Sequence, residues 1–182
     1  VGCVWSMALS SSEVNASMGK IVACPTAGSC GILPAVILSA GVKLGLDEDE
    51  LIRGLLAASA VGMIIGMNAT LSGAEGGCQA ECGSASAMGA AAVVEMMGGT
   101  PKMSLDAGSI ILQNILGLVC DPVAGLVEIP CAKRNAQGAI TALCTADMVM
   151  AGVEAKIPFD DAVSAMYKVC LLYTSPSPRD TR

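Results

Sequence analysis

The chain has 182 residues, no histidine and a formal net charge of −6, and it is 53% hydrophobic but only 2% aromatic and 14% charged. This length suffices for one domain with a core, and the acidic balance without a Lys/Arg cluster argues against a nucleic-acid-binding surface. Small residues take the space that aromatic side chains usually fill, which favours closely packed helices. No run alternates strictly between apolar and polar residues, so we expect an all-α fold, a compact multi-helix domain with a buried central helix.

Apolar segments separated by Gly- and Pro-rich breaks predict the helices. In chain order they cover about residues 3–19, 32–44, 47–69, 78–97, 104–118 and 131–153, and a last helix is capped by Asp160. Asp47 is a favourable N-cap for the third helix, and the acidic first turn after it suits the helix dipole. The segment 98–101, Gly-Gly-Thr-Pro, is expected to close the helix before it. The methionines, including Met63, Met67 and Met88, are expected to fill the core.

Both ends of the chain look artificial. Val1 lies inside a predicted helix and is not an initiating Met, and segment 170–182 breaks the helical pattern and resembles the translation of a transposon sequencing adaptor. We therefore expect residues 1–169 to be one catalytic-type domain truncated at both ends, and 170–182 to be a non-native tail. Cys170 would then not be a biological cysteine.

Two uncharged stretches, 21–42 and 54–74, are long enough to cross a membrane. Prolines and glycines interrupt the first, and both stretches lack an aromatic belt and clear positive flanks. A helix that is apolar all round can instead form the centre of a soluble helical domain. We favour the soluble alternative, with no membrane contact, and keep a polytopic membrane protein as the competing class.

The nine cysteines could indicate a disulfide scaffold in a short secreted protein. Long apolar helical segments do not suit a loop-rich, cross-linked fold, and no signal peptide is evident. A reducing cytoplasm, with most thiols acting as small apolar side chains, fits better.

Three cysteines, Cys78, Cys120 and Cys131, lie at breaks between helical segments, each close to Gly or Pro. Because the chain has no histidine, thiolate is its only soft metal ligand. The absence of a Cys-x-x-Cys pair argues against a zinc ribbon or ferredoxin pattern. Two interpretations stay open: these thiols hold a metal cluster, or they are buried structural thiols. Cys82, one helical turn beyond Cys78, either competes as a ligand or faces the core.

The loop 25–31, Pro-Thr-Ala-Gly-Ser-Cys-Gly, precedes a predicted helix. Its glycines allow successive backbone amides to turn towards one point, which makes a site for an anion such as a carboxylate. It is not a phosphate-binding P-loop, because the Gly-Lys-Ser/Thr ending is missing. The alternative is an ordinary tight turn between helices.

Polar residues elsewhere carry weaker signals. Glu13 and Asn15 fit a partly exposed helix face. Lys133, Arg134 and Asn135 stand near a predicted helix start, where cations oppose the helix dipole. An acidic cluster or a carboxylate substrate nearby would explain them.

Taken together, these segments resemble the iron–sulfur-dependent L-serine dehydratases (L-serine ammonia-lyases), specifically their alpha chain or catalytic domain. The resemblance is carried by Ser-Glu-Val-Asn-Ala-Ser-Met-Gly-Lys from Ser12, the Pro-Thr-Ala-Gly-Ser-Cys-Gly loop, Gly-Cys-Gln-Ala-Glu-Cys-Gly from Gly77, Cys-Asp-Pro-Val-Ala-Gly from Cys120, Pro-Cys-Ala-Lys-Arg-Asn-Ala from Pro130, and Met-Val-Met-Ala-Gly-Val from Met148. It runs over essentially all of 1–169.

The resemblance implies a [4Fe–4S] cluster held by Cys78, Cys120 and Cys131, whose fourth iron acts as a Lewis acid. The implied reaction is a β-elimination in which the serine hydroxyl is activated, a base removes the α-proton and water leaves. The products are pyruvate and ammonia, which implies a role in amino-acid degradation and gluconeogenesis.

The same resemblance implies which residues and partners meet L-serine. The family's Pro-Thr-x-Gly loop maps onto Pro25, Thr26 and Gly28, and with Ser29 it would hold the substrate carboxylate. Histidine is the usual base near neutral pH, and without one no catalytic base can be named in this chain. We expect the base from a missing N-terminal domain or a partner beta chain, and therefore an oligomer and an inactive isolated fragment. Alternatives are a related cluster lyase acting on threonine or cysteine, and an iron–sulfur scaffold without catalysis.

Overall fold

The computed structural model of the chain describes residues 2–126 and 128–174. Seven helices lie within them: α1 (Gly2–Ala16), α2 (Ile32–Leu44), α3 (Glu48–Asn68), α4 (Gly73–Met96), α5 (Pro101–Ile115), α6 (Glu128–Met150) and α7 (Phe159–Thr174). These residues form no strand, only an isolated bridge between Val123 and Leu126. The predicted all-α class is confirmed.

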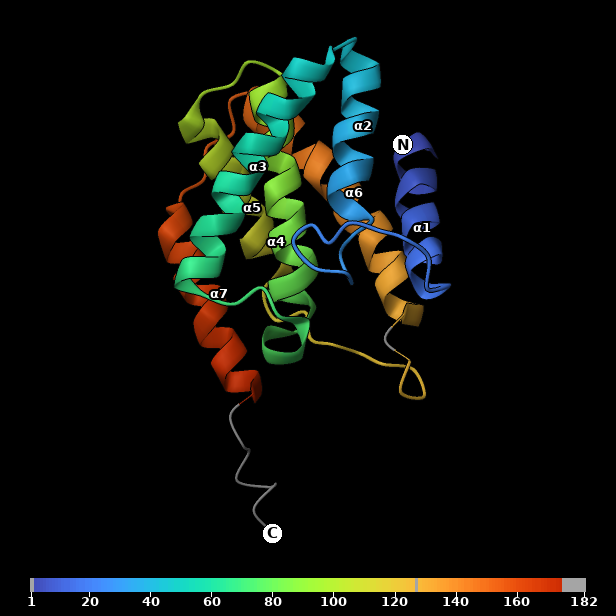
Figure 1. Cartoon of the computed structure of the whole chain (residues 1–182). Helices are drawn as coiled ribbons and strands as arrows, with labels where there is room; N and C mark the ends of the chain where they lie inside the picture. Colours follow the sequence, from blue (N-terminus) through green and yellow to red (C-terminus); the bar gives the residue numbers. More distant parts are fainter. Residues whose placement is uncertain (1, 127, 175–182) are drawn as a thin grey trace.

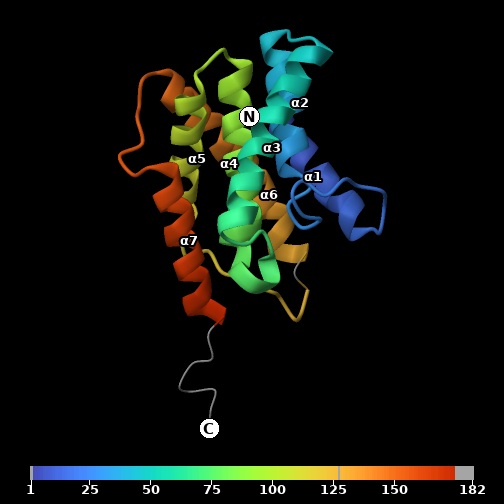
Figure 2. The ribbon, with the colours of Figure 1, turned by 60° about the vertical axis from the view of Figure 1, so that its left-hand side comes forward.

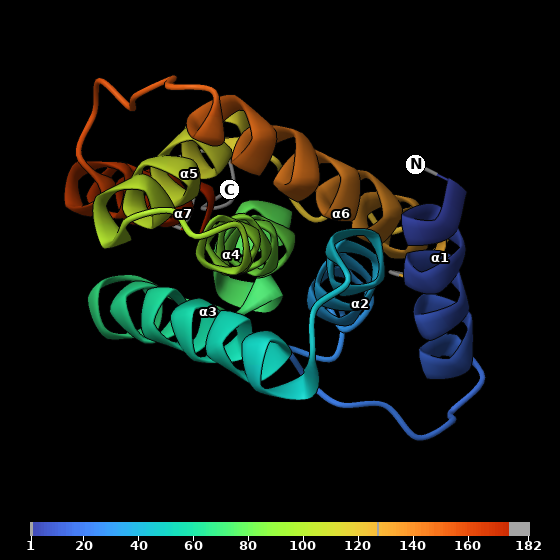
Figure 3. The same cartoon turned by 90° about the horizontal axis from the view of Figure 1, so that it is seen from above.

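The bundle has the buried central helix that the sequence predicts, and the structure shows that this helix is α4. It contacts α2, α3, α5, α6 and α7, whereas α1 packs against α2 and α6 at the edge of the bundle (Figures 1 and 3). Figure 2 shows α5 beside α7 on one flank of α4 and α1 beside α2 on the other. Every residue from 76 to 94 except Glu81 is buried. Because the side chains along α4 are small, five other helices can pack around it.

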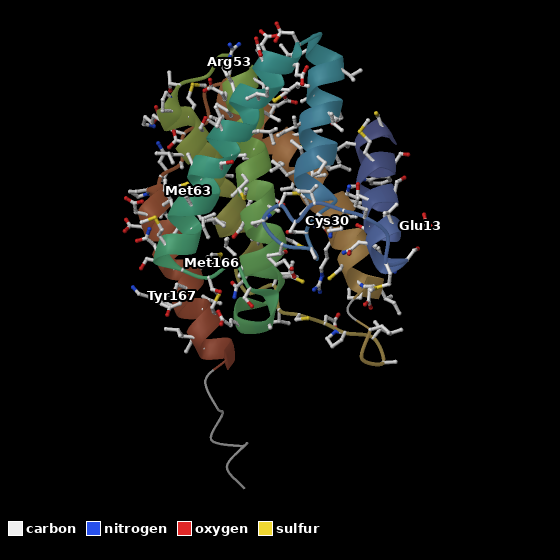
Figure 4. The ribbon with its side chains drawn as sticks, in the orientation of Figure 1. Glu13, Cys30, Arg53, Met63, Met166 and Tyr167 are labelled. Carbon is white, nitrogen blue, oxygen red and sulfur yellow. The ribbon has the colours of Figure 1, made fainter. Side chains whose placement is uncertain are left out.

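Helix α3 lies at the surface although its sequence is as apolar as a core helix. Within the described part of the chain it is the one helix long and apolar enough, by length and composition, to cross a membrane, and 28% of its apolar window is buried. Met63, labelled in Figure 4, is 64% exposed on α3, and Met67 is 80% exposed. The expectation that these two fill the core is therefore wrong, whereas Met88 on α4 is buried. Stretch 21–42 contains the loop before α2 and forms no helix of spanning length.

Helix ends follow local capping chemistry. Asp47 caps α3 as predicted: its side chain accepts a hydrogen bond from the Glu50 amide, and the Glu50 side chain accepts one from the Asp47 amide, both at 2.9 Å. Helix α4 ends at Met96, so segment 98–101 closes it as predicted. Within that segment, Thr100 also caps α5 by accepting from the Met103 amide, with Pro101 in the first turn. Asp160 lies inside the first turn of α7, which begins at Phe159, so its predicted capping role is wrong.

Helix α7 continues past Val169 to Thr174 without interruption. The predicted break in the helical pattern at residue 170 is therefore wrong. The Cys170 side chain is buried and accepts a hydrogen bond from Gln79 Nε2 at 3.5 Å. The division into a native domain of 1–169 and a non-native tail of 170–182 stays a prediction, and residues 175–182, like Val1, lie outside the described residues.

Gly77 kinks the first part of α4 just before Cys78. Its φ of 73° and ψ of −171° lie in a region that only glycine adopts readily. A Cβ placed on it would lie 3.0 Å from the Leu118 carbonyl oxygen and 3.1 Å from the Val119 Cα. The backbone N–H of Gln79 also donates to the Leu118 carbonyl at 2.8 Å. The missing side chain thus lets the segment that carries Cys120 pack directly against the start of α4.

We predict that Gly77→Ala lowers the free energy of unfolding by roughly 2 to 4 kcal/mol, because the new Cβ is both strained and pressed against backbone. Gly45→Ala is the matched control: its φ is also positive, at 69°, but an added Cβ meets nothing within 4 Å. The control should lose only about 1 to 2 kcal/mol. Urea unfolding followed by circular dichroism measures both, and equal losses would contradict the packing argument.

Candidate functional site

Four segments meet at one end of the bundle, the lower end in Figure 1. They are the loop before α2, the start of α4, the connection 116–126 and the start of α6. Each predicted site residue lies on one of these four. Cys78 follows the kink in α4, Cys120 lies in the connection, and Cys131 lies in the first turn of α6.

The Cys78 sulfur is the centre of this region. It is buried and accepts a hydrogen bond from Arg134 Nη1 at 2.9 Å. Hydrogen bonds from the Cys131 and Cys82 thiols, with that of Arg134, hold the pKa of Cys78 well below its ordinary value despite burial. The lowered pKa favours the thiolate, the form of cysteine that binds metals.

The neighbouring thiols shift in the opposite direction. The pKa of Cys82 and the pKa of Cys131 are raised, first because each hydrogen-bonds to Cys78 and second because each is desolvated. An electrostatic interaction with Cys120 also helps to raise the pKa of Cys131, so these two side chains lie near each other. All three predicted ligands thus lie in one region. Cys82 is fully buried in the core, and its thiol contacts Cys78 as well.

Arg134 and Gln79 hold the connection that carries Cys120. Arg134 Nη1 also donates to the Val119 carbonyl at 2.8 Å, and its Nη2 lies 3.8 Å from Asp121. The buried Gln79 side chain accepts from the Gly117 amide at 2.9 Å. From the sequence, cations near the start of α6 have two explanations, a cluster of acidic groups or a carboxylate substrate. The contacts of Arg134 with the Cys78 sulfur and the Asp121 carboxylate support the first.

The donors at this end of the bundle are cysteine thiols, soft ligands that suit iron–sulfur groups. Within residues 2–126 and 128–174, no group of three His, Cys, Asp or Glu side chains is arranged to hold one metal ion. An iron–sulfur cluster takes its thiolate ligands from separate positions along a chain. Three thiol-bearing segments, one of them presenting a thiolate beside a guanidinium, fit such a group. No disulfide joins the described cysteines.

The loop before α2 lies against the start of α4. The Thr26 hydroxyl donates to Glu81 Oε1 at 2.5 Å and lies 2.9 Å from the Ser29 hydroxyl, which is buried. A Cβ on Gly28 would lie 2.6 Å from the same Glu81 oxygen. Three of the four predicted substrate-binding residues, Thr26, Gly28 and Ser29, are thus close together at Glu81, and Pro25 precedes them.

Two asparagines hold the same loop from other helices. Asn135 on α6 accepts from the Gly31 amide at 2.9 Å and donates to the Gly28 carbonyl at 2.7 Å. Asn15 on α1 donates to the Ala27 carbonyl at 2.8 Å. Figure 4 shows Cys30 at the inner end of this loop, below α2, and Glu13 on the outer side of α1. The loop is therefore held by α1, α4 and α6 together and is more than a simple turn.

The loop amides are only partly available for an anion. The Cys30 and Ile32 amides donate to backbone carbonyls, and the Gly31 amide donates to Asn135. Among the described residues, the amides of segment 27–29 have no hydrogen-bond acceptor. An incoming carboxylate would have to use this segment.

Cavities lie on both sides of the cysteines. One of 230 Å³ is lined by Gly28, Cys131 and Asn15, so it joins the loop to a predicted ligand. Another of 460 Å³ is lined by Arg134 and Cys82, among others. Either could admit a molecule as small as an amino acid.

Sequence reasoning did not predict the contacts of four residues that build this region. Glu81, Gln79 and Asn135 lie beside the predicted cysteines in sequence, but nothing in the pattern says what they contact. Asn15 looks like an exposed residue of a helix face. Their partners lie 12 to 107 residues away along the chain, so only the packed helices identify them.

We predict that Asn135→Asp destabilises the fold by roughly 2 to 4 kcal/mol, because two partly buried carbonyls lose their donor and face a carboxylate instead. Nδ2 of Asn135 donates to both the Gly28 and the Cys131 carbonyls, at 2.7 and 2.8 Å. Thermal unfolding measures the loss. Asn114→Asp, at an exposed position on α5, adds the same charge and should change stability by less than about 0.5 kcal/mol. Similar losses for the two variants would contradict the role of Asn135.

Residues 3–176 match the family described as serine dehydratase alpha chain. The chain is 58% identical over 164 residues to the L-serine dehydratase alpha chain of Peptoniphilus asaccharolyticus, covering 90% of this chain and 56% of that one. It is 55% identical over 164 residues to the probable L-serine dehydratase alpha chain of Bacillus subtilis, covering 90% and 55%. The L-serine dehydratase TdcG of Escherichia coli is 44% identical over 163 residues, covering 88% and 36%.

The chain spans about half the length of the first two relatives. Nearly its whole length is covered by the family match, which includes the loop before α2 and all the cysteines of the site. The chain belongs to the serine dehydratase alpha chain family.

Proposed function

We propose that this chain is the catalytic portion of an enzyme that converts L-serine into pyruvate and ammonia. One observation carries the proposal: in a chain of this family, three cysteine-bearing segments meet the loop before α2 at one end of α4. Thr26 of that loop donates to Glu81 of α4. Relatives named L-serine dehydratase support the substrate.

Cys78, Cys120 and Cys131 would hold a [4Fe–4S] cluster. Such a cluster, when bound, supplies a Lewis-acidic iron that makes a hydroxyl a better leaving group. Arg134 donates to the Cys78 sulfur and, through the Val119 carbonyl, ties the Cys120 segment to it. Cys82 lies close enough to Cys78 to be the alternative third ligand.

The chain's own residues would bind and orient the substrate. The loop of Pro25, Thr26, Gly28 and Ser29 would receive the substrate carboxylate, with the amides of segment 27–29 as donors. Asn15 and Asn135 keep that loop in place relative to α1 and α6. The buried, small-residue face of α4 limits access of water to the reacting atoms.

Loss of the α-proton to a base and of the hydroxyl as water leaves an enamine, which tautomerises and hydrolyses to pyruvate and ammonia. With no histidine in the 182 residues, we place the base outside this chain, in a further domain or in a beta chain, which the name alpha chain suggests. We further propose an oligomeric, soluble, cytoplasmic enzyme of amino-acid degradation whose pyruvate can feed gluconeogenesis.

We predict that replacing Cys78, Cys120 or Cys131 singly by Ser prevents assembly of the cluster, because each removes a thiolate ligand. Anaerobic reconstitution followed by iron and sulfide analysis measures the loss, and addition of L-serine to the unchanged chain should alter its visible spectrum. Cys82→Ser tests the alternative ligand and should keep the cluster.

Cys24→Ser and Cys144→Ser are the matched controls and should keep full iron and sulfide content. Burial raises the pKa of Cys24 to about 11, so its thiol stays protonated, and Cys144 is exposed on α6. Equal loss in these controls, or loss in Cys82→Ser but not in Cys120→Ser, would overturn the ligand assignment.

We also predict that the isolated 182-residue chain, even with a full complement of iron and sulfide, does not turn over L-serine. The reason is the missing base. A pyruvate assay coupled to lactate dehydrogenase measures it. Turnover by the isolated chain would show that the base lies within these residues.

A further inference from the structure

Glu81 is the exception in the most buried part of the molecule. From residue 76 to residue 94 it is the single residue of α4 that is not buried. Its carboxylate lies between the loop before α2 and the start of α4 itself. It accepts from Thr26, and a Cβ on either Gly28 or Gly73 would collide with it. The absence of side chains at these two glycines leaves room for this carboxylate.

The Glu81 carboxylate is a negative charge that the described residues leave unbalanced. Their ion pairs join Arg53 to Glu50, Lys102 to Asp106 and Arg134 to Asp121, and none involves Glu81. A carboxylate offers about four acceptor positions, and the Thr26 hydroxyl is the one donor that the described residues provide. A half-buried carboxylate with so few donors is costly unless a cation completes it.

The position of Glu81 relates it to the rest of the site. It lies three residues after Cys78, so both side chains project from the same face of α4. On its other side it holds the loop for which we propose a carboxylate-binding role. A molecule bound between the loop and Cys78 would therefore present its nearest positive group to Glu81.

We propose that Glu81 binds the ammonium group of the amino-acid substrate, opposite the loop that receives its carboxylate. This inference rests on the proposed function and deepens it by naming the residue that distinguishes an amino acid from a hydroxy acid. The Thr26 hydroxyl orients the Glu81 carboxylate by donating to one of its oxygens. The other oxygen of Glu81 is left for the ammonium hydrogens of the substrate.

A merely structural Glu81 would only anchor the loop through Thr26. Glu81→Gln separates the two roles, because the amide oxygen can still accept from Thr26 whereas the charge is gone. Glu95→Gln, near the other end of α4, removes the same charge away from the loop and serves as the matched control.

Isothermal titration calorimetry on the anaerobically reconstituted chain tests the proposal with two probes, L-serine and 3-hydroxypropanoate, which lacks only the ammonium group. The unchanged chain and Glu95→Gln should prefer L-serine. Glu81→Gln should bind L-serine roughly 10- to 100-fold more weakly, as expected for loss of a hydrogen bond to a charged group. Its affinity for 3-hydroxypropanoate should not fall. A structural defect would weaken both probes.

Three outcomes overturn this proposal alone, and a fourth also overturns the proposed function. The first is equal binding of both probes by the unchanged chain. The second is an undiminished preference for L-serine in Glu81→Gln, and the third is a loss of affinity for both probes in that variant. Absence of L-serine binding by the unchanged chain would overturn the proposed function of this chain as well. The other outcomes leave that function standing, so the two failures are distinguishable.

Discussion

The site depends on how closely the other helices approach α4. The sequence of α4 is built largely from Gly, Ala and Ser. A Cβ placed on Gly89 of this helix would lie 3.4 Å from Val36 on α2 and from Ala142 on α6. Gly138 on α6 makes a similar approach to Ser86. Because small side chains allow short distances between helix axes, the cysteine-bearing starts of α4 and α6 come close enough for their sulfurs to interact. Larger residues along α4 would separate them.

The same end of the bundle combines two kinds of chemistry. On one side, Arg134 stabilises the Cys78 thiolate and ties it to the Cys120 segment. On the other, Glu81 and Asn135 hold the loop before α2 against the helices that carry Cys78 and Cys131. The loop and the thiols are therefore held at a defined separation by side chains that belong to neither group. Such second-layer contacts are a common way to orient reactive groups.

Local signals in the sequence predicted some features well. The bounds of α2 agree with the prediction, and Asp47 with Glu50 forms a capping box. Segment 98–101 closes α4 as predicted, and its Thr100 also caps α5. The capping role predicted for Asp160 was wrong, because this residue lies within the first turn of α7. The exposed methionines of α3 show that apolar composition alone does not say whether a helix is central.

The sequence by itself determined the helical class, the family and the cysteines of the site, because these depend on composition, periodicity and local motifs. Only the tertiary structure decided that α4 is the central helix, that Cys82 contacts Cys78, and that Glu81, Asn15 and Asn135 hold the loop. The physical reason is distance along the chain: Asn135 meets Gly28 from 107 residues away, and no local preference encodes such a contact. It follows from the packing of whole helices, in which every small residue along α4 takes part.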